Sequence, residues 1–366
     1  MKILHVLSTP RAEGTPNLVL DWLATGEHEQ EIFVLNSTPA DLTDRLRTGA
    51  AWYDEADFFN RRGAAKFFGM AARLRRVCRE RRPDLLICWP TGFANWVCLG
   101  ARLAGVKRLL VHCGNRPNRG RKADWITRYV MWPVALFGAR CACCSDYVRD
   151  SFRAVPWIPH GLFQTIYNCA RAGEVTVRAE RARAERPSPN GKQAIMVATL
   201  EGHKDHATAL RAAVLVRQRE PAFRLLLAGE GSRRAELEKQ AAQLGLQGTV
   251  EFLGARRDVP ELLGRAGLFV FSTTPEEGWG TVLLEALAAG LPVVASDVPA
   301  CREVLAAGKY GTLVPPADPE ALAEAILFVL QKGTAPERPS EARAYVERFT
   351  PQRMMSDYLD LVSDHE

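Results

Sequence analysis

The stretch Glu277-Gly-Trp-Gly-Thr-Val-Leu-Leu-Glu285 decides how the second half of this chain is interpreted. The apolar run Leu268–Ser272 before it predicts a buried strand, and the segment from Gly280 to Gly290 predicts a helix. Glu277 is then expected on the loop at the carboxyl end of the strand, and Glu285 about a turn and a half into the helix. Free N–H groups at a helix start suit a phosphate, and carboxylates accept hydrogen bonds from paired hydroxyl groups. The pattern therefore predicts a nucleotide-sugar site.

The stretch resembles the E-x7-E signature of retaining glycosyltransferases of family 4 (glycosyl transferases group 1), which have the two-domain GT-B fold. The resemblance is strong over residues 190–330 and weaker over 1–170. Further matching segments follow in the family's order: Val250–Gly254, Ser272, Glu285–Asp297, Arg302-Glu303, Gly311–Pro315 and Asp318–Leu322. It implies an α/β fold of two Rossmann-like, doubly wound domains that face each other across a cleft. The bare spacing, without these segments, would favour an ordinary strand–turn–helix with two solvated glutamates.

Composition predicts a soluble globular protein. The 366 residues are 47% hydrophobic and 25% charged, and no apolar run reaches the length of a membrane span. The N-terminus enters a strand-like run directly, without the pattern of a signal peptide. Nine scattered cysteines fit a reducing compartment, so we expect a cytoplasmic protein. The run Cys141-Ala-Cys143-Cys144 lacks a second Cys/His pair at zinc spacing, which favours a buried strand over a metal cluster.

The net charge of +6 is unevenly distributed, because residues 1–170 carry 24 basic and 15 acidic residues. The excess is concentrated in Arg61–Arg82, where apolar residues recur at helical spacing among nine basic residues and one acid. A basic amphipathic helix can lie on the inner face of an anionic membrane as a peripheral attachment. It can equally pack its apolar stripe on a sheet and leave its arginines in water. The sequence leaves both interpretations open, and it predicts no nucleic-acid partner.

Strand and helix patterns alternate along both halves, which predicts parallel sheets covered by helices. The expected domains are 1–170 (acceptor domain), 171–190 (linker and surface loop), 191–340 (nucleotide-sugar domain) and 341–366 (a helix that crosses back to the first domain). The expected strands are Ile3–Leu7, Glu31–Leu35, Leu85–Cys88, Leu109–Cys113, Arg140–Cys144, Ala194–Ala198, Arg224–Leu227, Val250–Leu253, Leu268–Phe271 and Pro292–Ala295. A helix over Trp125–Phe137 is expected to be bent or interrupted near Pro133.

The resemblance assigns roles to single residues. Three are implied to be catalytic: Glu277 would hold the donor-sugar hydroxyls, Lys204 would neutralise the leaving diphosphate, and His112 would hydrogen-bond a sugar hydroxyl. Lys204 matches the lysine of the family's diphosphate clamp, whereas Thr199 stands where an arginine is common. The positive charge of that arginine is either lacking in this protein or supplied by Arg11. The other residues implied to bind the donor are Gly14, Thr199, Gly229, Arg256 (stacking on the base), Gly278, Trp279, Gly280, Thr281 and Glu285 (on the ribose hydroxyls).

The predicted activity is retaining transfer of a hexosyl group from a nucleoside-diphosphate sugar to a hydroxyl acceptor. UDP is favoured as the nucleotide and GDP is the second option. No Asp-x-Asp pair stands in the sequence, so we expect transfer without a metal or other cofactor. The acceptor is expected to be a lipid-linked glycan, a cell-surface polysaccharide precursor or a small molecule. Aromatic residues such as Trp125 and Trp132 suit an apolar acceptor, and core packing explains them equally well.

A catalytically idle nucleotide-sugar-binding or partner protein on the same fold is the alternative function. Two departures from the family pattern favour it. They are Thr199 in the clamp and Glu13, which stands before Gly14 where the family commonly has a second glycine.

Overall fold

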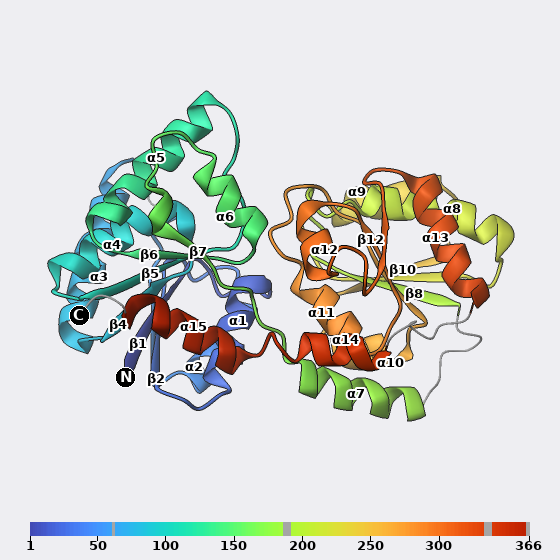
Figure 1. Cartoon of the computed structure of the whole chain (residues 1–366), viewed down its shortest axis with the longest axis horizontal. Helices are drawn as coiled ribbons and strands as arrows, with labels where there is room; N and C mark the ends of the chain where they lie inside the picture. The colour runs from blue at the N-terminus through green and yellow to red at the C-terminus, as the bar shows by residue number, and fades with distance from the viewer. Residues whose placement is uncertain (61–62, 186–191, 333–338, 364–366) are drawn as a thin grey trace. The chain divides into compact units, whose positions relative to one another are not determined.

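The computed structural model describes residues 1–60, 63–185, 192–332 and 339–363. The chain divides into two compact units: unit 1 comprises Met1–Cys169 and Pro351–Glu366, and unit 2 comprises Ala170–Thr350. Each unit holds one parallel sheet with helices on its faces (Figure 1). The predicted class, two doubly wound α/β domains, is confirmed.

Unit 1 has a seven-stranded sheet in the order β3-β2-β1-β4-β5-β6-β7. Its strands are β1 (Lys2–Leu7), β2 (Glu29–Val34), β3 (Trp52–Glu55), β4 (Leu85–Cys88), β5 (Arg108–Cys113), β6 (Arg140–Cys143) and β7 (Phe163–Thr165). The chain moves outward from β1 to β3 and then from β4 to β7, so the strand order reverses between β1 and β4. At such a point the carboxyl ends of the strands leave room for a ligand.

The helices of unit 1 include one that comes from the far end of the chain. They are α1 (Gly14–Leu23), α2 (Thr43–Gly49), α3 (Ala65–Arg81), α4 (Ala94–Leu103), α5 (Arg121–Leu136), α6 (Asp146–Arg153) and α15 (Pro351–Ser363), with short 3-10 turns η1 (Thr91–Phe93) and η2 (His160–Leu162). α15, red in Figure 1, lies beside the blue α1. Its Met354 and Tyr358 are buried in the same core as Trp22 and Trp89.

Unit 2 has a six-stranded sheet in the order β10-β9-β8-β11-β12-β13. Its strands are β8 (Gln193–Val197), β9 (Arg224–Ala228), β10 (Val250–Gly254), β11 (Leu268–Phe271), β12 (Val293–Ser296) and β13 (Thr312–Val314). Its helices are α7 (Ala172–Glu185), α8 (His206–Arg219), α9 (Arg234–Gln243), α10 (Val259–Arg265), α11 (Thr281–Ala288), α12 (Pro299–Val304), α13 (Pro319–Lys332) and α14 (Pro339–Val346). The strand order reverses between β8 and β11, the two strands that lead into the candidate site.

The predicted linker 171–190 is wrong for most of its length, because α7 occupies Ala172–Glu185. Val175, Ala179 and Ala182 are buried at helical spacing, and the many charged residues around them concealed this stripe in the sequence. α7 packs closely on α10, since a Cβ on Gly264 would lie 2.2 Å from the carbonyl oxygen of Ala179. The turn-rich segment Pro187–Gly191 lies outside the described residues.

Two helix predictions also need correction. The single C-terminal helix is two helices, α14 in unit 2 and α15 in unit 1, and α15 starts at Pro351. α5 is continuous through Pro133 and starts at Arg121, four residues earlier than expected. Cys141, Cys143 and Cys144 are all buried, and the first two belong to β6, as predicted. Within the described residues, no helix is long and apolar enough to cross a membrane.

Candidate functional site

The loops that follow β8 and β11 bring Lys204 and Glu277 together in unit 2. The Lys204 ammonium donates a hydrogen bond to Oε2 of Glu277, and both side chains are largely buried, 14% and 8% exposed. Oε1 of Glu277 accepts the backbone N–H groups of Gly278 and Trp279 at 3.2 and 3.4 Å. The two residues that the sequence placed on separate loops therefore form one buried ion pair at the carboxyl ends of the central strands.

The Lys204 charge keeps Glu277 ionised despite its burial. Burial alone would raise the pKa of this carboxyl group, but the charge and hydrogen bond of Lys204, with smaller contributions from His203 and the Trp279 N–H, leave the pKa below 4.5. Phe271, the last residue of β11, lies under the ammonium with its ring centroid 4.9 Å from Nζ. This cation–π contact is a feature of the site that the sequence analysis missed.

Hydrogen bonds between the two loops fix the position of Lys204. The carbonyl oxygen of His203 accepts the Thr273 hydroxyl at 2.9 Å and the Thr274 N–H at 3.0 Å. His206, at the start of α8, is buried, and its Nδ1 lies 2.8 Å from the carbonyl oxygen of Lys204. A carbonyl only accepts, so Nδ1 carries the proton; burial lowers the pKa of His206 to about 4 and keeps the ring neutral. His206 therefore acts as a support for the lysine loop.

Gly280 starts α11 from the left-handed region, with φ of 82°. This conformation turns the chain so that the first N–H groups of α11 begin four residues after Glu277, with Thr281 as the first helical residue. Glu285 is the fifth residue of the helix and is half-buried. Trp279 is buried against Phe349, with ring centroids 5.6 Å apart, so its side chain belongs to the core and only its backbone faces Glu277.

Position 229 requires glycine because of close backbone packing, which the sequence did not reveal. A Cβ there would lie 1.9 Å from the carbonyl oxygen of Ala198, and its φ is 150°. A Cβ on Gly231 would lie 2.4 Å from the carbonyl oxygen of Leu200. The glycines let the β9 loop pack on the loop that carries Thr199. This backbone contact explains why both positions are glycine without any contact to a ligand. Thr199 is half-buried in this loop.

Arg256 forms a two-point ion pair with Asp258. Its Nε and Nη2 lie 2.8 and 2.6 Å from the two carboxylate oxygens, and its side chain is 40% exposed. The pair holds the guanidinium plane in one orientation on the loop after β10. Its stacking on a base stays a prediction.

Unit 1 contains the other two predicted residues, Gly14 and His112. Gly14 is the first residue of α1, and a Cβ there would meet open space. The preceding Glu13 has its carboxylate 4.0 Å from Arg11, the proposed substitute cation. Both residues lie in unit 1, and their contribution to donor binding stays a prediction.

His112 lies at the carboxyl end of β5 and is almost fully buried. Its Nδ1 is 2.7 Å from the Tyr358 hydroxyl, and its ring packs on Trp89. Burial lowers the pKa of His112 to about 3, so the ring is neutral. Only Nε2, near Gly114, is left to meet a sugar hydroxyl, and that role stays a prediction.

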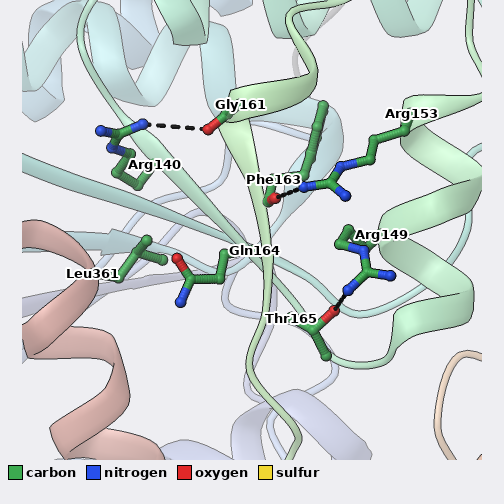
Figure 2. Close-up of a pocket in the computed structure, with 8 residues that line it drawn as sticks. All are labelled: Arg140, Arg149, Arg153, Gly161, Phe163, Gln164, Thr165 and Leu361. Carbon is green, nitrogen blue, oxygen red and sulfur yellow. Dashed lines mark hydrogen bonds between the residues drawn. The ribbon is translucent and has the colours of Figure 1, made fainter.

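A basic pocket of about 270 Å³ lies elsewhere in unit 1, along the edge strand β7 (Figure 2). Arg140 and Arg153 donate to the carbonyl oxygens of Gly161 and Phe163 at 3.3 and 2.9 Å, and Arg149 donates to the Thr165 hydroxyl at 3.1 Å. These bonds fasten α6 to β7 and β6 to the turn η2 that precedes β7. None of the predicted site residues lines this pocket.

Comparison with known proteins identifies the family. The model of glycosyl transferases group 1 matches residues 178–345. A Bacillus subtilis protein named as glycosyltransferase EpsF is 30% identical over 315 residues, which are 81% of this chain and 79% of EpsF. The chain belongs to the group 1 glycosyltransferases. The resemblance to the glycosyl transferases group 1 is thereby confirmed.

Two further relatives show where the similarity lies. The phosphatidyl-myo-inositol mannosyltransferase of Mycobacterium tuberculosis is 35% identical over 179 residues, 47% of each chain. The crystal structure of Anabaena HepE in complex with UDP and glucose superposes over 100% of both chains with a TM-score of 0.84 and 20% identity, which shows a shared fold. Coverage of the relatives varies widely, and in one case the chain spans only 15% of the relative's length.

Proposed function

We propose that this protein transfers a hexosyl group from a nucleoside-diphosphate sugar to a hydroxyl acceptor, with retention of anomeric configuration and without a metal. UDP is the favoured nucleotide, with GDP the second option. The observation that carries the proposal is the buried Lys204–Glu277 pair at the carboxyl ends of β8 and β11. Burying two charges is unfavourable unless they meet partners, which makes such a pair more typical of a binding site than of a stability element.

The pair has the chemistry that a diphosphate-sugar requires. Glu277 is kept ionised, so its oxygens can accept hydrogen bonds from sugar hydroxyls at any pH well above 4.5. Lys204 supplies positive charge from a site of restricted water access, where it stabilises a departing diphosphate more strongly than it would in bulk water. Glu285, one turn into α11, is placed for the ribose hydroxyls in this proposal.

Positive charge from Lys204 and from the start of α11 supports transfer without a metal. Retention would then follow from attack on the same face as the leaving group, with a donor phosphate oxygen taking the acceptor's proton, as the family resemblance implies. The proposed acceptor is a lipid-linked glycan or polysaccharide precursor, supported by relatives named for polysaccharides and for phosphatidylinositol.

A thermal-shift panel of UDP, GDP, ADP, CMP and NAD with matching nucleotide sugars, each with and without EDTA, tests the proposal. Ligand at about 100 times its Kd stabilises a protein by about 2.7 kcal/mol, a readily measured shift. We expect one nucleoside diphosphate and its nucleotide sugars to stabilise the protein equally with and without EDTA. The protein should also hydrolyse the matching nucleotide sugar slowly when no acceptor is present. A shift that EDTA abolishes contradicts metal independence. Binding with neither hydrolysis nor transfer supports the idle protein, and no shift with any nucleotide contradicts the donor site.

A further inference from the structure

Helix α5 of unit 1 exposes a continuous row of large apolar side chains. The exposed fractions are 61% for Trp125, 47% for Ile126, 47% for Tyr129, 51% for Trp132 and 82% for Leu136. We call these five residues the apolar stripe of α5. The rings of Trp125 and Tyr129 stack with centroids 5.7 Å apart, so part of the stripe is already ordered.

The opposite face of α5 holds the helix on unit 1. Val130, Met131 and Val134 are buried there, and α5 packs against α4 (Figure 1). At about 100° per residue, Trp125, Tyr129, Trp132 and Leu136 fall within about 60° of one another, on the side away from these three. The stripe is thus a second apolar face of α5. The sequence left open that core packing explains these aromatic residues, and their exposure rules that explanation out. Contiguous exposed apolar patches in monomeric proteins usually mark an interaction surface.

Helix α3, which contains most of the basic segment predicted from the sequence as a membrane contact, has no comparable face. Its apolar residues Met70, Leu74 and Val77 are buried, and Phe68 is its one large apolar side chain that is well exposed. Arg73 and Arg81 form ion pairs with Asp54 and Glu31. Arg61 and Arg62 lie outside the described residues. The face that would enter a membrane is therefore already used for folding.

Basic residues surround the stripe of α5. Residues 113–139 contain a single acid, Asp124, and five basic residues, namely Arg116, Arg119, Arg121, Lys122 and Arg128. On the helical projection Arg121 and Arg128 fall about 50–70° to one side of the centre of Trp125, Tyr129, Trp132 and Leu136. Lys122 falls about 50° to the other side, between Tyr129 and Ile126. An apolar band rich in Trp and Tyr with basic residues along both borders is the pattern of a helix that lies in a lipid interface.

We propose that α5 binds the surface of an anionic lipid bilayer, with its apolar stripe in the interface and its flanking basic residues on lipid phosphates. Charge complementarity selects this occupant over a second copy of the chain. A symmetric dimer through the stripe would place one basic border against the other, which is repulsive. Trp and Tyr suit the interface because each has an apolar ring and a polar tip.

The position of α5 in the fold connects this surface to the proposed reaction. The helix follows β5, and in a parallel sheet the helix after a strand begins at the strand's carboxyl end, the edge at which such sheets bind ligands. A bilayer bound to α5 would hold that edge of unit 1 near the headgroups. This points to an acceptor hydroxyl on a lipid-linked molecule. That conclusion rests on the proposed sugar transfer, whereas the proposal that α5 binds a bilayer does not depend on it.

Vesicle co-sedimentation of the full chain at low salt tests the surface. The probe is phosphatidylcholine vesicles with or without phosphatidylglycerol. We expect the wild type to bind only the anionic vesicles, and the triple variant W125S/Y129S/W132S to bind them at least about tenfold more weakly. The matched controls are Trp157→Ser, which removes an 80% exposed tryptophan outside α5, and Phe68→Ser on α3. Both should bind like the wild type.

A charge variant separates the two parts of the surface. R121E/K122E/R128E keeps the apolar stripe and should lose binding to anionic vesicles. Failure of the wild type to bind anionic vesicles overturns the proposal, and so does equal binding by the triple variant. Loss of binding in Phe68→Ser instead would assign the contact to α3. A wild-type dimer that the triple variant makes monomeric, with no vesicle binding by either, would identify a second copy as the occupant.

Stabilisation by UDP, measured on the same variants, keeps this test separate from the proposed function. The triple variant should retain the wild-type thermal shift with UDP, because the stripe and the Lys204–Glu277 pair lie in different units. That retained shift also shows that the variant is folded. If UDP stabilises neither protein, UDP is not the donor nucleotide, and the vesicle result still decides the membrane surface.

Discussion

The carboxyl edges of the two sheets bury polar side chains in opposite ways. In unit 2, Glu277 is buried as an ion because Lys204 compensates its charge. In unit 1, His112 at the end of β5 is buried as a neutral ring bonded to Tyr358 and packed on Trp89. Trp89 in turn donates to the buried, neutral His5 in the middle of β1. A charged edge suits a diphosphate, whereas a neutral edge suits hydroxyl groups and apolar surface. The division into donor and acceptor domains that the family resemblance implies would use this difference, and it stays a prediction.

Replacing Lys204 should give the largest effect. Lys204→Ala leaves Glu277 buried without its counter-ion, which should lower the free energy of unfolding by about 3–5 kcal/mol. It also removes the cation proposed for the leaving diphosphate, so transfer should fall about 10²- to 10³-fold. Chemical denaturation and steady-state transfer or donor hydrolysis measure the two effects.

The double variant K204A/E277Q separates stability from catalysis. Removing both charges should restore much of the stability and none of the activity. Lys239→Ala, an exposed lysine on α9, is the control for loss of one positive charge and should change neither quantity. Near-wild-type kinetics in Lys204→Ala would remove the pair from the mechanism.

Acidification should affect unit 1 through its neutral histidines. Burial lowers the pKa of His5 to about 4 and that of His112 to about 3. The unfolded chain takes up these protons as the pH falls below about 6.5 and the folded chain does not, so stability is fully present above pH 6.5 and declines toward pH 4. At pH 5 each histidine should lower the free energy of unfolding by about 2 kcal/mol relative to neutral pH.

The slope of stability against pH, measured by denaturation between pH 7 and 5, checks this expectation. His112→Gln cannot titrate and should flatten the slope, whatever its effect on absolute stability. His206→Gln is the matched variant in unit 2, where burial lowers the histidine pKa to about 4 as well. An unchanged slope in both variants would contradict neutral burial.

The same burial explains which elements the sequence could predict. Central strands such as Leu85–Cys88 and Leu268–Phe271 are covered on both faces and appear as short apolar runs, and these were predicted within a residue or two. The edge strands β3 and β7 are only partly covered and carry mixed residues, and they were missed. Helix α7 was missed because its buried stripe is made of small residues among many charges.

The site shows the same limit. The loop positions of Lys204 and Glu277 followed from the strands before them, but their direct contact depends on two loops 73 residues apart in the chain. The glycines of the β9 loop looked like ligand contacts because a sequence does not show that another backbone approaches them. The exposure of the α5 aromatics was equally hidden, since a buried and an exposed apolar face have the same helical period.

Tyr358→Phe should have an intermediate effect on stability and tests the bond between His112 and α15 in unit 1. The change removes the hydroxyl that lies 2.7 Å from His112 Nδ1 and keeps the ring against Trp22. Loss of one buried hydrogen bond should cost about 1–2 kcal/mol of unfolding free energy, and stabilisation by UDP should be unchanged. A double-mutant cycle with His112→Gln gives the coupling energy, and a value near zero would show that the bond adds nothing to the docking of α15.

The smallest expected effect concerns Arg256 in unit 2. If its guanidinium stacks on the donor base, Arg256→Ala should weaken UDP binding roughly two- to fivefold and leave binding of inorganic pyrophosphate unchanged. Isothermal titration of both ligands measures the difference. Arg178→Ala is the control, because it breaks the same kind of two-point pair, with Glu261 at 2.9 and 2.8 Å, between α7 and α10. Equal losses for UDP and pyrophosphate would assign Arg256 to the phosphates, and unit 2 would then bind its donor almost entirely by charge.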